Sequence, residues 1–166
     1  MIETAEIQPD LIQQLAKLLR HKAYRMVVAE SCTGGWLAKV LTDLPGSSDW
    51  FDRGYVTYSN QAKHEMLGVN QETLDQFGAV SLETVQEMTK GALDESGADV
   101  AVAISGIAGP GGGSDEKPVG TVCFSFLFSN GESVLDQLCF KGDRDQVRRQ
   151  SVIHALETVI EQLKHV

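Results

Sequence analysis

Apolar residues recur along this chain with two different periods, which predicts alternating helices and strands. From Pro9 to about His21, leucine and isoleucine recur every three or four residues, which is typical of an amphipathic helix with proline in its first turn. A short apolar run then predicts a strand over 26–30, and a helix is expected over 34–42. Helical and strand patterns that alternate in this way indicate an α/β protein.

The alternation continues to the C-terminus. Further strands are predicted over 54–58, 99–105, 119–128 and 133–140. Further helices are predicted over 61–67, over 81–96 and from about Asp143 onward. The run 99–105 is nearly continuous in small and β-branched residues, as expected of a central strand covered on both faces. The last two strands are separated by a short turn and predict a hairpin.

Length and charge narrow the class of protein. A chain of 166 residues can form one domain with a core but not two ordinary domains, so residues 1–166 are predicted to be a single domain. No apolar run approaches a membrane span and no secretory leader is visible, so we expect a soluble, cytoplasmic protein without membrane partners. The net charge of −9 argues against nucleic-acid partners. A small anionic substrate needs only local cations and remains compatible.

Cysteine and histidine patterns indicate no metal site. The three cysteines are an odd number without Cys-x-x-Cys spacing, which favours reduced thiols. Cys123 and Cys139 lie in apolar runs and are expected to pack, whereas Cys32 lies beside Ser31 and is the one thiol with possible chemistry. The four histidines show no metal-ligand spacing. Neither a metal nor a cofactor is therefore expected.

The turn after the first predicted strand is rich in hydroxyl groups and ends in two glycines. Turns of this kind, between strand and helix, hold the chemistry of many α/β enzymes. Thr33 is expected to cap the next helix, while Gly34 and Gly35 would let a substrate approach the backbone amides at its positive end. Ser31 would then face an anion or oxyanion site. An ordinary capped turn has the same pattern, so this segment alone leaves both interpretations open.

Several nucleotide and hydrolase motifs are excluded. The glycine-rich segment 106–113 lacks the Gly-Lys-Ser/Thr ending of a Walker loop, and its spacing does not match Gly-x-Gly-x-x-Gly. Ala29 and Thr33 stand where a Gly-x-Ser-x-Gly nucleophile elbow has glycines. Kinase, dinucleotide-binding and α/β-hydrolase interpretations are therefore disfavoured.

Serine and lysine remain as candidate chemistry. Without a convincing histidine base, a nucleophilic Ser31 needs another proton acceptor, and a desolvated neutral lysine can serve. Lys63 is the candidate, because it follows the strand that ends at Tyr58 and the edge of a sheet could bring it near Ser31. Tyr58 could relay a proton or hold substrate, and Glu30 could orient the lysine or be a surface acid. A solvated lysine and a packed tyrosine are the alternatives.

Candidate binding groups lie near two other element ends. Ser105 and Gly106 end the central strand, and amides of the next loop could hold a phosphate or carboxamide oxygen. Arg144 and Arg148, early in the last helix, could grip a phosphate with two donors each. A plain turn and solvated arginines are the alternatives here. The loop glycines in question are Gly109, Gly111 and Gly112.

Seven short blocks occur in a fixed order. They are Ala29-Glu-Ser-Cys-Thr-Gly-Gly35, Tyr58-Ser-Asn60 with Lys63, Leu67-Gly-Val69, Gly78-Ala-Val-Ser81, Gly106-Ile-Ala-Gly-Pro110, Lys117-Pro-Val-Gly-Thr121 and Phe140-Lys-Gly-Asp-Arg144. Together they resemble the CinA C-terminal family over roughly residues 10 to 163. The resemblance implies a single-domain, three-layer α/β/α sandwich with a mixed sheet. It also implies nicotinamide-nucleotide amidase activity, in which nicotinamide mononucleotide and water give nicotinate mononucleotide and ammonia.

The resemblance also implies roles for residues. Lys63 would take the proton of Ser31, which attacks the carboxamide carbon, and amides from Thr33 to Gly35 would stabilise the oxyanion. Tyr58 would pass a proton to the leaving amine. Ser105 stands where threonine is usual in the family, and the hydroxyl is retained. The groups expected to hold the ribose phosphate are Asn60, Ser105, Arg144 and the loop 109–113.

Two other functions stay open at this point. A non-catalytic module that binds a nucleotide or a partner protein, as the link of some relatives to competence and DNA damage suggests, needs no paired Ser31 and Lys63. A serine amidase for another small amide is the second alternative. A homo-oligomer in the form of a dimer is expected. The aromatic residues Trp36, Trp50 and Phe51 could mark its surface or belong to the core.

Overall fold

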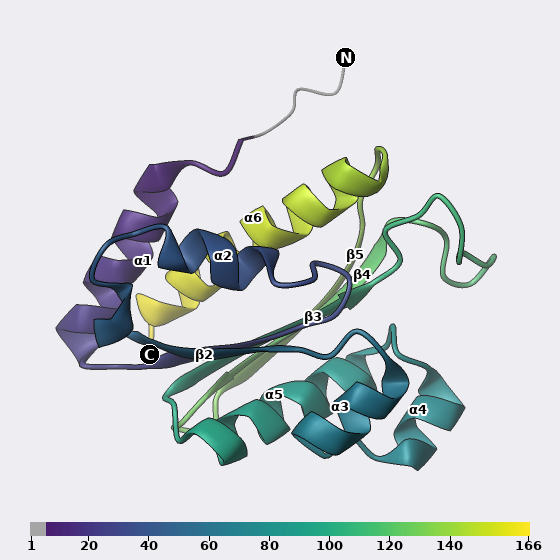
Figure 1. Cartoon of the computed structure of the whole chain (residues 1–166), viewed down its shortest axis with the longest axis horizontal. Helices are drawn as coiled ribbons and strands as arrows, with labels where there is room; N and C mark the ends of the chain where they lie inside the picture. Colours follow the sequence, from purple (N-terminus) through teal and green to yellow (C-terminus); the bar gives the residue numbers. More distant parts are fainter. Residues whose placement is uncertain (1–5) are drawn as a thin grey trace.

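The computed structural model describes residues 6–166 and shows a sheet between two layers of helices (Figure 1). Its strands are β1 (Met26–Glu30), β2 (Phe51–Val56), β3 (Val100–Gly106), β4 (Thr121–Phe128) and β5 (Ser133–Cys139). Its helices are α1 (Pro9–Lys22), α2 (Trp36–Thr42), α3 (Asn60–Leu67), α4 (Gln71–Phe77), α5 (Leu82–Ser96) and α6 (Arg144–Leu163), with a 3-10 turn over Ser47–Asp49. Helices α1, α2 and α6 cover one face of the sheet, and α3, α4 and α5 cover the other (Figure 1).

The sheet is mixed, as the family resemblance implied. Its strand order is β2-β1-β3-β4-β5. Strand β1 pairs in parallel with both β2 and β3, whereas β3, β4 and β5 pair antiparallel. The carboxyl ends of β1, β2 and β3 therefore meet at one edge of the sheet, which is where α/β proteins form their sites.

Two apolar cores, one on each face, hold the layers together. Alternate residues of β1 point to opposite faces: Met26 and Val28 belong to the core beneath α1, α2 and α6, while Val27 and Ala29 belong to the core above α5. Every residue of β1 is buried. The continuous apolar runs of β1 and β3 are thus explained by burial on both faces.

The structure corrects the bounds of three predicted elements. Helix α2 begins at Trp36, two residues later than expected. Strand β2 runs over Phe51–Val56 rather than 54–58, which leaves Tyr58 in the loop that follows. Helix α3 begins at Asn60, one residue earlier than expected, and the Ser59 hydroxyl caps it by accepting a hydrogen bond from the Ala62 amide.

One helix, α4, was not predicted. Leu74 is its only buried residue, so the segment carries no apolar periodicity that a sequence pattern could detect. Helix α4 and the loop that follows lead the chain into α5, whose first turn is capped by the Ser81 hydroxyl. This loop also forms one wall of the candidate site described below.

Some side-chain placements differ from expectation. Trp50 is fully buried in the first core, and Trp36 and Phe51 pack against that core, so these aromatics do not form an exposed surface. Cys123 is buried as expected, but Cys139 is exposed, because it lies at the end of an edge strand. Across residues 6–166, no helix is long and apolar enough to cross a membrane.

Candidate active site

A cavity of about 210 Å³ opens at the carboxyl ends of the three parallel strands. Its lining comes from the ends of β1 and β3 and the turns that follow them, from the loop after β2, from α3, from the loop before α5 and from the start of α6. Its lining residues are Ser31, Cys32, Tyr58, Asn60, Lys63, Ala79, Val80, Ser105, Gly106, Ala108 and Arg144.

Ser31 and Lys63 are in direct contact in this cavity. Lys63 Nζ donates hydrogen bonds to Ser31 Oγ at 2.9 Å and to the carbonyl oxygen of Thr57 at 2.7 Å. Lys63 is 1% exposed and Ser31 is 8% exposed. Burial lowers the pKa of Lys63 to about 8, because the charged ammonium loses its hydration. A sizeable fraction of Lys63 is therefore neutral near physiological pH and can accept the proton of Ser31.

Helix α3 places Lys63 on its buried side. Lys63 and Leu67 lie four residues apart and face the same direction, and both are buried. Leu67 packs into the second core with Val85 and Met88 of α5. The apolar contacts of α3 thus help to hold Lys63 in a buried position, although its charged form would be better solvated in water.

The turn that carries Ser31 is fixed by its own backbone. The Ser31 amide donates to the carbonyl of Ile104 on β3, and the Ser31 carbonyl accepts from the Gly34 amide. Gly34 and Gly35 both have positive φ angles, of 59° and 98°, which side chains other than glycine rarely adopt. These glycines therefore serve the shape of the turn, and neither lines the cavity. Of the amides expected around the oxyanion, that of Gly34 is already paired.

The N-terminus of α2 does not match the expected anion site. Gly35, which has no side chain, occupies the cap position, so Thr33 is not the cap. The buried carboxylate of Glu30 instead accepts hydrogen bonds from Thr33 Oγ1, at 2.6 Å, and from the amides of Leu37, at 2.9 Å, and Ala38, at 3.0 Å. Glu30 is thus neither a surface acid nor a partner of Lys63. The positive end of α2 holds the protein's own carboxylate.

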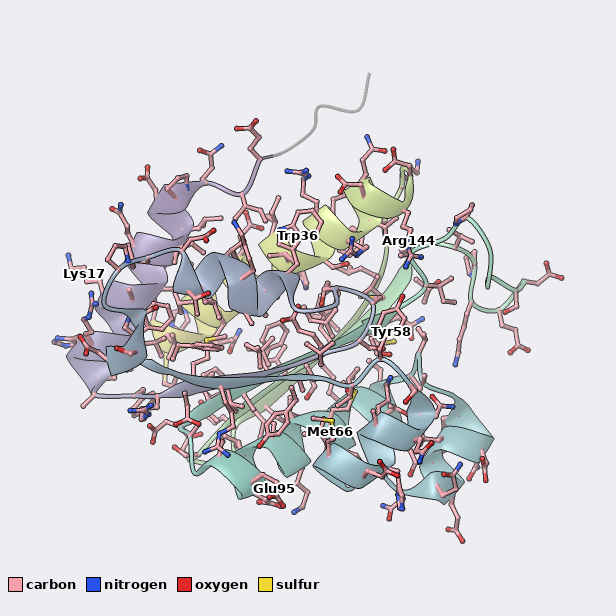
Figure 2. The ribbon with its side chains drawn as sticks, in the orientation of Figure 1. Lys17, Trp36, Tyr58, Met66, Glu95 and Arg144 are labelled. Atoms are coloured by element: carbon pink, nitrogen blue, oxygen red, sulfur yellow. The ribbon has the colours of Figure 1, made fainter. Side chains whose placement is uncertain are left out.

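Arg144 joins three segments at the mouth of the cavity. Its guanidinium donates to the carbonyl of Gly109 at 2.8 Å and to the hydroxyl of Tyr58 at 3.0 Å. Tyr58 is 61% exposed, and Figure 2 shows Tyr58 and Arg144 close together at the edge of the sheet. Tyr58 comes from the loop between β2 and α3, Arg144 is the first residue of α6, and the two side chains meet at the opening.

Ser105 lies beside the nucleophile rather than at the mouth. Strand β3 pairs Ile104 with Glu30, so Ser105, the next residue of β3, lies level with Ser31, which follows β1. The Ser105 hydroxyl is buried and has no hydrogen-bond partner within residues 6–166. It lines the cavity and is free to bind a polar group of a ligand there.

Other expected site residues lie outside the cavity lining. Arg148 donates to the carbonyls of Cys32, at 3.0 Å, and Thr33, at 3.1 Å, so it supports the turn from behind. Gly109, Gly111 and Gly112 belong to the loop after β3, which projects from the edge of the sheet (Figure 1).

Cys32 is not a second nucleophile. Burial raises the pKa of its thiol to about 11, which keeps it protonated at neutral pH. The described part of the chain, residues 6–166, also contains no group of three or more histidine, cysteine or acidic side chains placed to hold a metal ion. The chemistry available in this cavity is that of a serine paired with a lysine.

The structure adds residues that the analysis of single side chains missed. The Thr57 carbonyl holds Lys63, and Ala79, Val80 and Ala108 line the cavity. Backbone atoms and small side chains give no chemical signal in a sequence. Only the blocks 78–81 and 106–110, which carry the family resemblance, pointed to the three lining residues.

Comparisons with known proteins agree with this architecture. A family model described as the CinA C-terminal domain matches residues 8–163. Nicotinamide-nucleotide amidohydrolase PncC from Escherichia coli (strain K12) is 57% identical over 152 residues, which cover 92% of each chain. A putative competence-damage inducible protein from Symbiobacterium thermophilum is 48% identical over 157 residues, covering 90% of this chain and 37% of the other.

A solved structure extends the likeness to three dimensions. The competence/damage inducible protein CihA from Agrobacterium tumefaciens matches with a TM-score of 0.91 and 44% identity over 95% of each chain. The family model covers residues 8–163, and the structural match covers 95% of the chain. The chain belongs to the CinA C-terminal domain family.

Proposed function

We propose that this chain hydrolyses the carboxamide of nicotinamide mononucleotide to nicotinate mononucleotide and ammonia, a step of pyridine-nucleotide salvage. The observation that carries the proposal is the hydrogen bond between Lys63 Nζ and Ser31 Oγ inside a cavity of about 210 Å³. Relatives named nicotinamide-nucleotide amidohydrolase, at 57% identity over 92% of the chain, supply the substrate class.

The proposed reaction begins with proton transfer. Neutral Lys63 takes the proton of Ser31, and Oγ attacks the carboxamide carbon to give a tetrahedral intermediate with a negative oxygen. Backbone amides of the turn after Ser31 are the candidates to stabilise that oxygen. The lysine proton moves to the leaving nitrogen, with Tyr58 as a possible relay, and ammonia departs. Water then cleaves the acyl-serine, releases nicotinate mononucleotide and restores both groups.

The mouth of the cavity suits the phosphate end of the substrate. Arg144 is the cation of the lining whose side chain lies at the opening, whereas Lys63 lies at the floor. We assign the phosphate to Arg144 and the ribose to Asn60, which lines the same side. Ser105, beside the nucleophile, is then closer to the carboxamide than to the phosphate.

A kinetic comparison tests the assignment. Wild type, Ser31→Ala and Lys63→Ala are incubated with nicotinamide mononucleotide without added metal or ATP, and ammonia and nicotinate mononucleotide are followed together. Lys17→Ala is the matched control, because Lys17 is an exposed lysine on α1 and extends into solvent (Figure 2). We expect wild type and Lys17→Ala each to release ammonia and nicotinate mononucleotide in equal amounts and at similar rates. In Ser31→Ala and Lys63→Ala, the rate of product formation should fall by about a thousandfold or more.

The other outcomes separate the alternatives. Near-normal turnover by Lys63→Ala would contradict the serine-lysine mechanism. Tight binding of the nucleotide without any product would favour a non-catalytic binding module. Turnover of a different small amide, but not of this nucleotide, would keep the mechanism and change the substrate. The expected dimer and cytoplasmic location remain part of the proposal, and light scattering of the purified chain tests the dimer.

A further inference from the structure

Glu30 is a fully buried acid directly before the proposed nucleophile. It ends β1, and its side chain is 0% exposed. A buried carboxylate is costly unless hydrogen bonds compensate it, and Glu30 accepts three. One comes from within the turn, from Thr33, and two come from the first turn of α2, from Leu37 and Ala38. A single side chain thus ties the strand end, the nucleophile turn and the helix together.

The backbone of Glu30 reaches the other half of the catalytic pair. Its carbonyl oxygen accepts a hydrogen bond from the Thr57 amide at 2.9 Å. The Thr57 carbonyl in turn accepts from Lys63 Nζ at 2.7 Å. Glu30 therefore stands between Ser31, its neighbour in sequence, and the backbone that holds Lys63.

A carboxylate suits this position better than an amide or an apolar group. Glu30 Oε1 accepts from Thr33 and Leu37, while Oε2 accepts from Ala38. Glutamine at this position keeps the shape but offers one acceptor oxygen, so its NH₂ group faces an amide N–H. An apolar side chain leaves both helix amides without a partner.

We propose that Glu30 is a positioning residue of the reaction, which holds the turn 31–35 so that Ser31 Oγ stays aligned with Lys63. The inference rests on the proposed function for its substrate, and on geometry alone for its effect on Ser31. Glu30 touches neither substrate nor the reacting atoms in this arrangement. Its removal should therefore reduce kcat without changing the proton affinity of Lys63.

The experiment compares Glu30→Gln and Thr33→Val with a matched control, Thr89→Val. Thr33 and Thr89 are both fully buried, and each contributes a hydroxyl to a buried hydrogen bond, but Thr89 contacts Ser125 on the far side of the sheet. For each variant, kcat and KM for nicotinamide mononucleotide, the pH profile and the melting temperature are measured. The rate at which a fluorophosphonate probe labels Ser31 is measured too, with Ser31→Ala as the blank.

We expect Glu30→Gln to lower kcat by about 10- to 100-fold while KM changes by less than about threefold. Its labelling rate should fall in parallel, and the midpoint of its pH profile should stay where wild type has it. Thr33→Val should show a smaller loss of the same kind. Thr89→Val should lose melting temperature but keep kcat and the labelling rate.

Three results would overturn the inference. One is a Glu30→Gln variant with wild-type kcat and labelling. Another is a rate loss that comes with a shifted pH midpoint, which would mean that Glu30 acts on Lys63 through its charge. The third is an equal loss in Thr89→Val, which would reduce the effect to general destabilisation. If Glu30→Gln does not fold, Thr33→Val, which keeps the carboxylate, carries the same comparison.

The labelling assay keeps this inference apart from the proposed function. A wild type that labels at Ser31 but leaves nicotinamide mononucleotide intact would refute the proposed substrate, and the labelling rates would still test Glu30. A wild type that neither labels nor turns over would overturn both, because Ser31 would then not be an activated nucleophile.

Discussion

The buried amine of Lys63 links the proposed reaction to pH. Its pKa is lowered to about 8 by burial, and only the neutral amine can accept the proton of Ser31. We therefore expect kcat/KM to rise by about tenfold per pH unit well below pH 8 and to level off above it. Rates measured from about pH 6 to 10 at constant ionic strength check this profile. A flat profile would show that Lys63 is not the base.

The same burial should cost stability at neutral pH. The pKa of Lys63 is about 8 in the folded chain, against 10.5 for an ordinary lysine. Below pH 8 both states hold the proton and the folded state bears the cost of a buried charge, whereas above pH 10.5 neither state is charged and the cost disappears. Lys63→Met should therefore raise the free energy of unfolding at pH 7 by about 1 to 3 kcal/mol.

Urea unfolding at two pH values tests that prediction. The advantage of Lys63→Met over wild type should shrink as the pH rises from 8 toward 10.5, because wild type gains stability over that interval. Lys17→Met, a substitution of an exposed lysine, is the control and should show no such change with pH. Lys63→Met destabilised equally at both pH values would contradict the argument.

At the scale of elements, α3 and α5 approach each other closely beside the site. A Cβ atom at Gly91 of α5 would lie 1.9 Å from the carbonyl oxygen of Leu67, at the end of α3. Gly91→Ala must therefore push the two helices apart, at a cost of about 1 to 3 kcal/mol. Since α3 also carries Lys63, we expect kcat to fall together with the melting temperature.

Thermal melts and steady-state rates of the same preparations check this prediction. Gln86→Ala is the control, because Gln86 is an exposed residue of α5 and alanine favours helix. Gln86→Ala should leave the melting temperature and kcat near their wild-type values. A Gly91→Ala variant with normal melting and normal rate would mean that α3 and α5 can separate freely.

Elements with a periodic or continuous buried pattern gave the clearest predictions from sequence. The periodic apolar faces of α1 and α6 and the continuous runs of β1 and β3 gave clear patterns. Helix α4 buries only Leu74, and the edge strand β2 has no buried residue, so α4 was missed and the start of β2 was placed too late. With so few buried residues, α4 and β2 show no regular spacing of apolar residues in the sequence.

Some residues of the candidate site could be predicted from the sequence, and others could not. Ser31 and Lys63 were proposed from their chemical types and from the family blocks, and the structure brings their side chains together. The environment of Glu30 could not be predicted, because its partners are mostly backbone amides, which every residue except proline carries. From sequence, Arg148 was expected to bind substrate. Its actual partners could not be predicted either, because they are the backbone carbonyls of Cys32 and Thr33.

For the whole molecule, the three thiols should report the integrity of the fold. Cys32 and Cys123 are buried, and burial raises the pKa of each to about 11, whereas Cys139 is exposed. We expect Ellman's reagent to modify one thiol rapidly in the native protein and all three in denaturant. Cys139→Ser should abolish the rapid phase. If two thiols of the native wild type reacted rapidly, Cys32 or Cys123 would have to lie at the surface.

The order of strands in the sheet also determines at what stage of synthesis Ser31 and Lys63 can be aligned. Ser31 and Lys63 both leave the ribosome before β3, yet the Ser31 amide pairs with Ile104 of β3, and β1 lies between β2 and β3. Pairing between segments so distant in sequence is slow and waits for the later one to be synthesised. A chain that stops after Lys63 but before β3 thus carries both reactive groups without the strand that aligns them. The proposed hydrolysis therefore has to wait until residues 100–106 have been added to the chain.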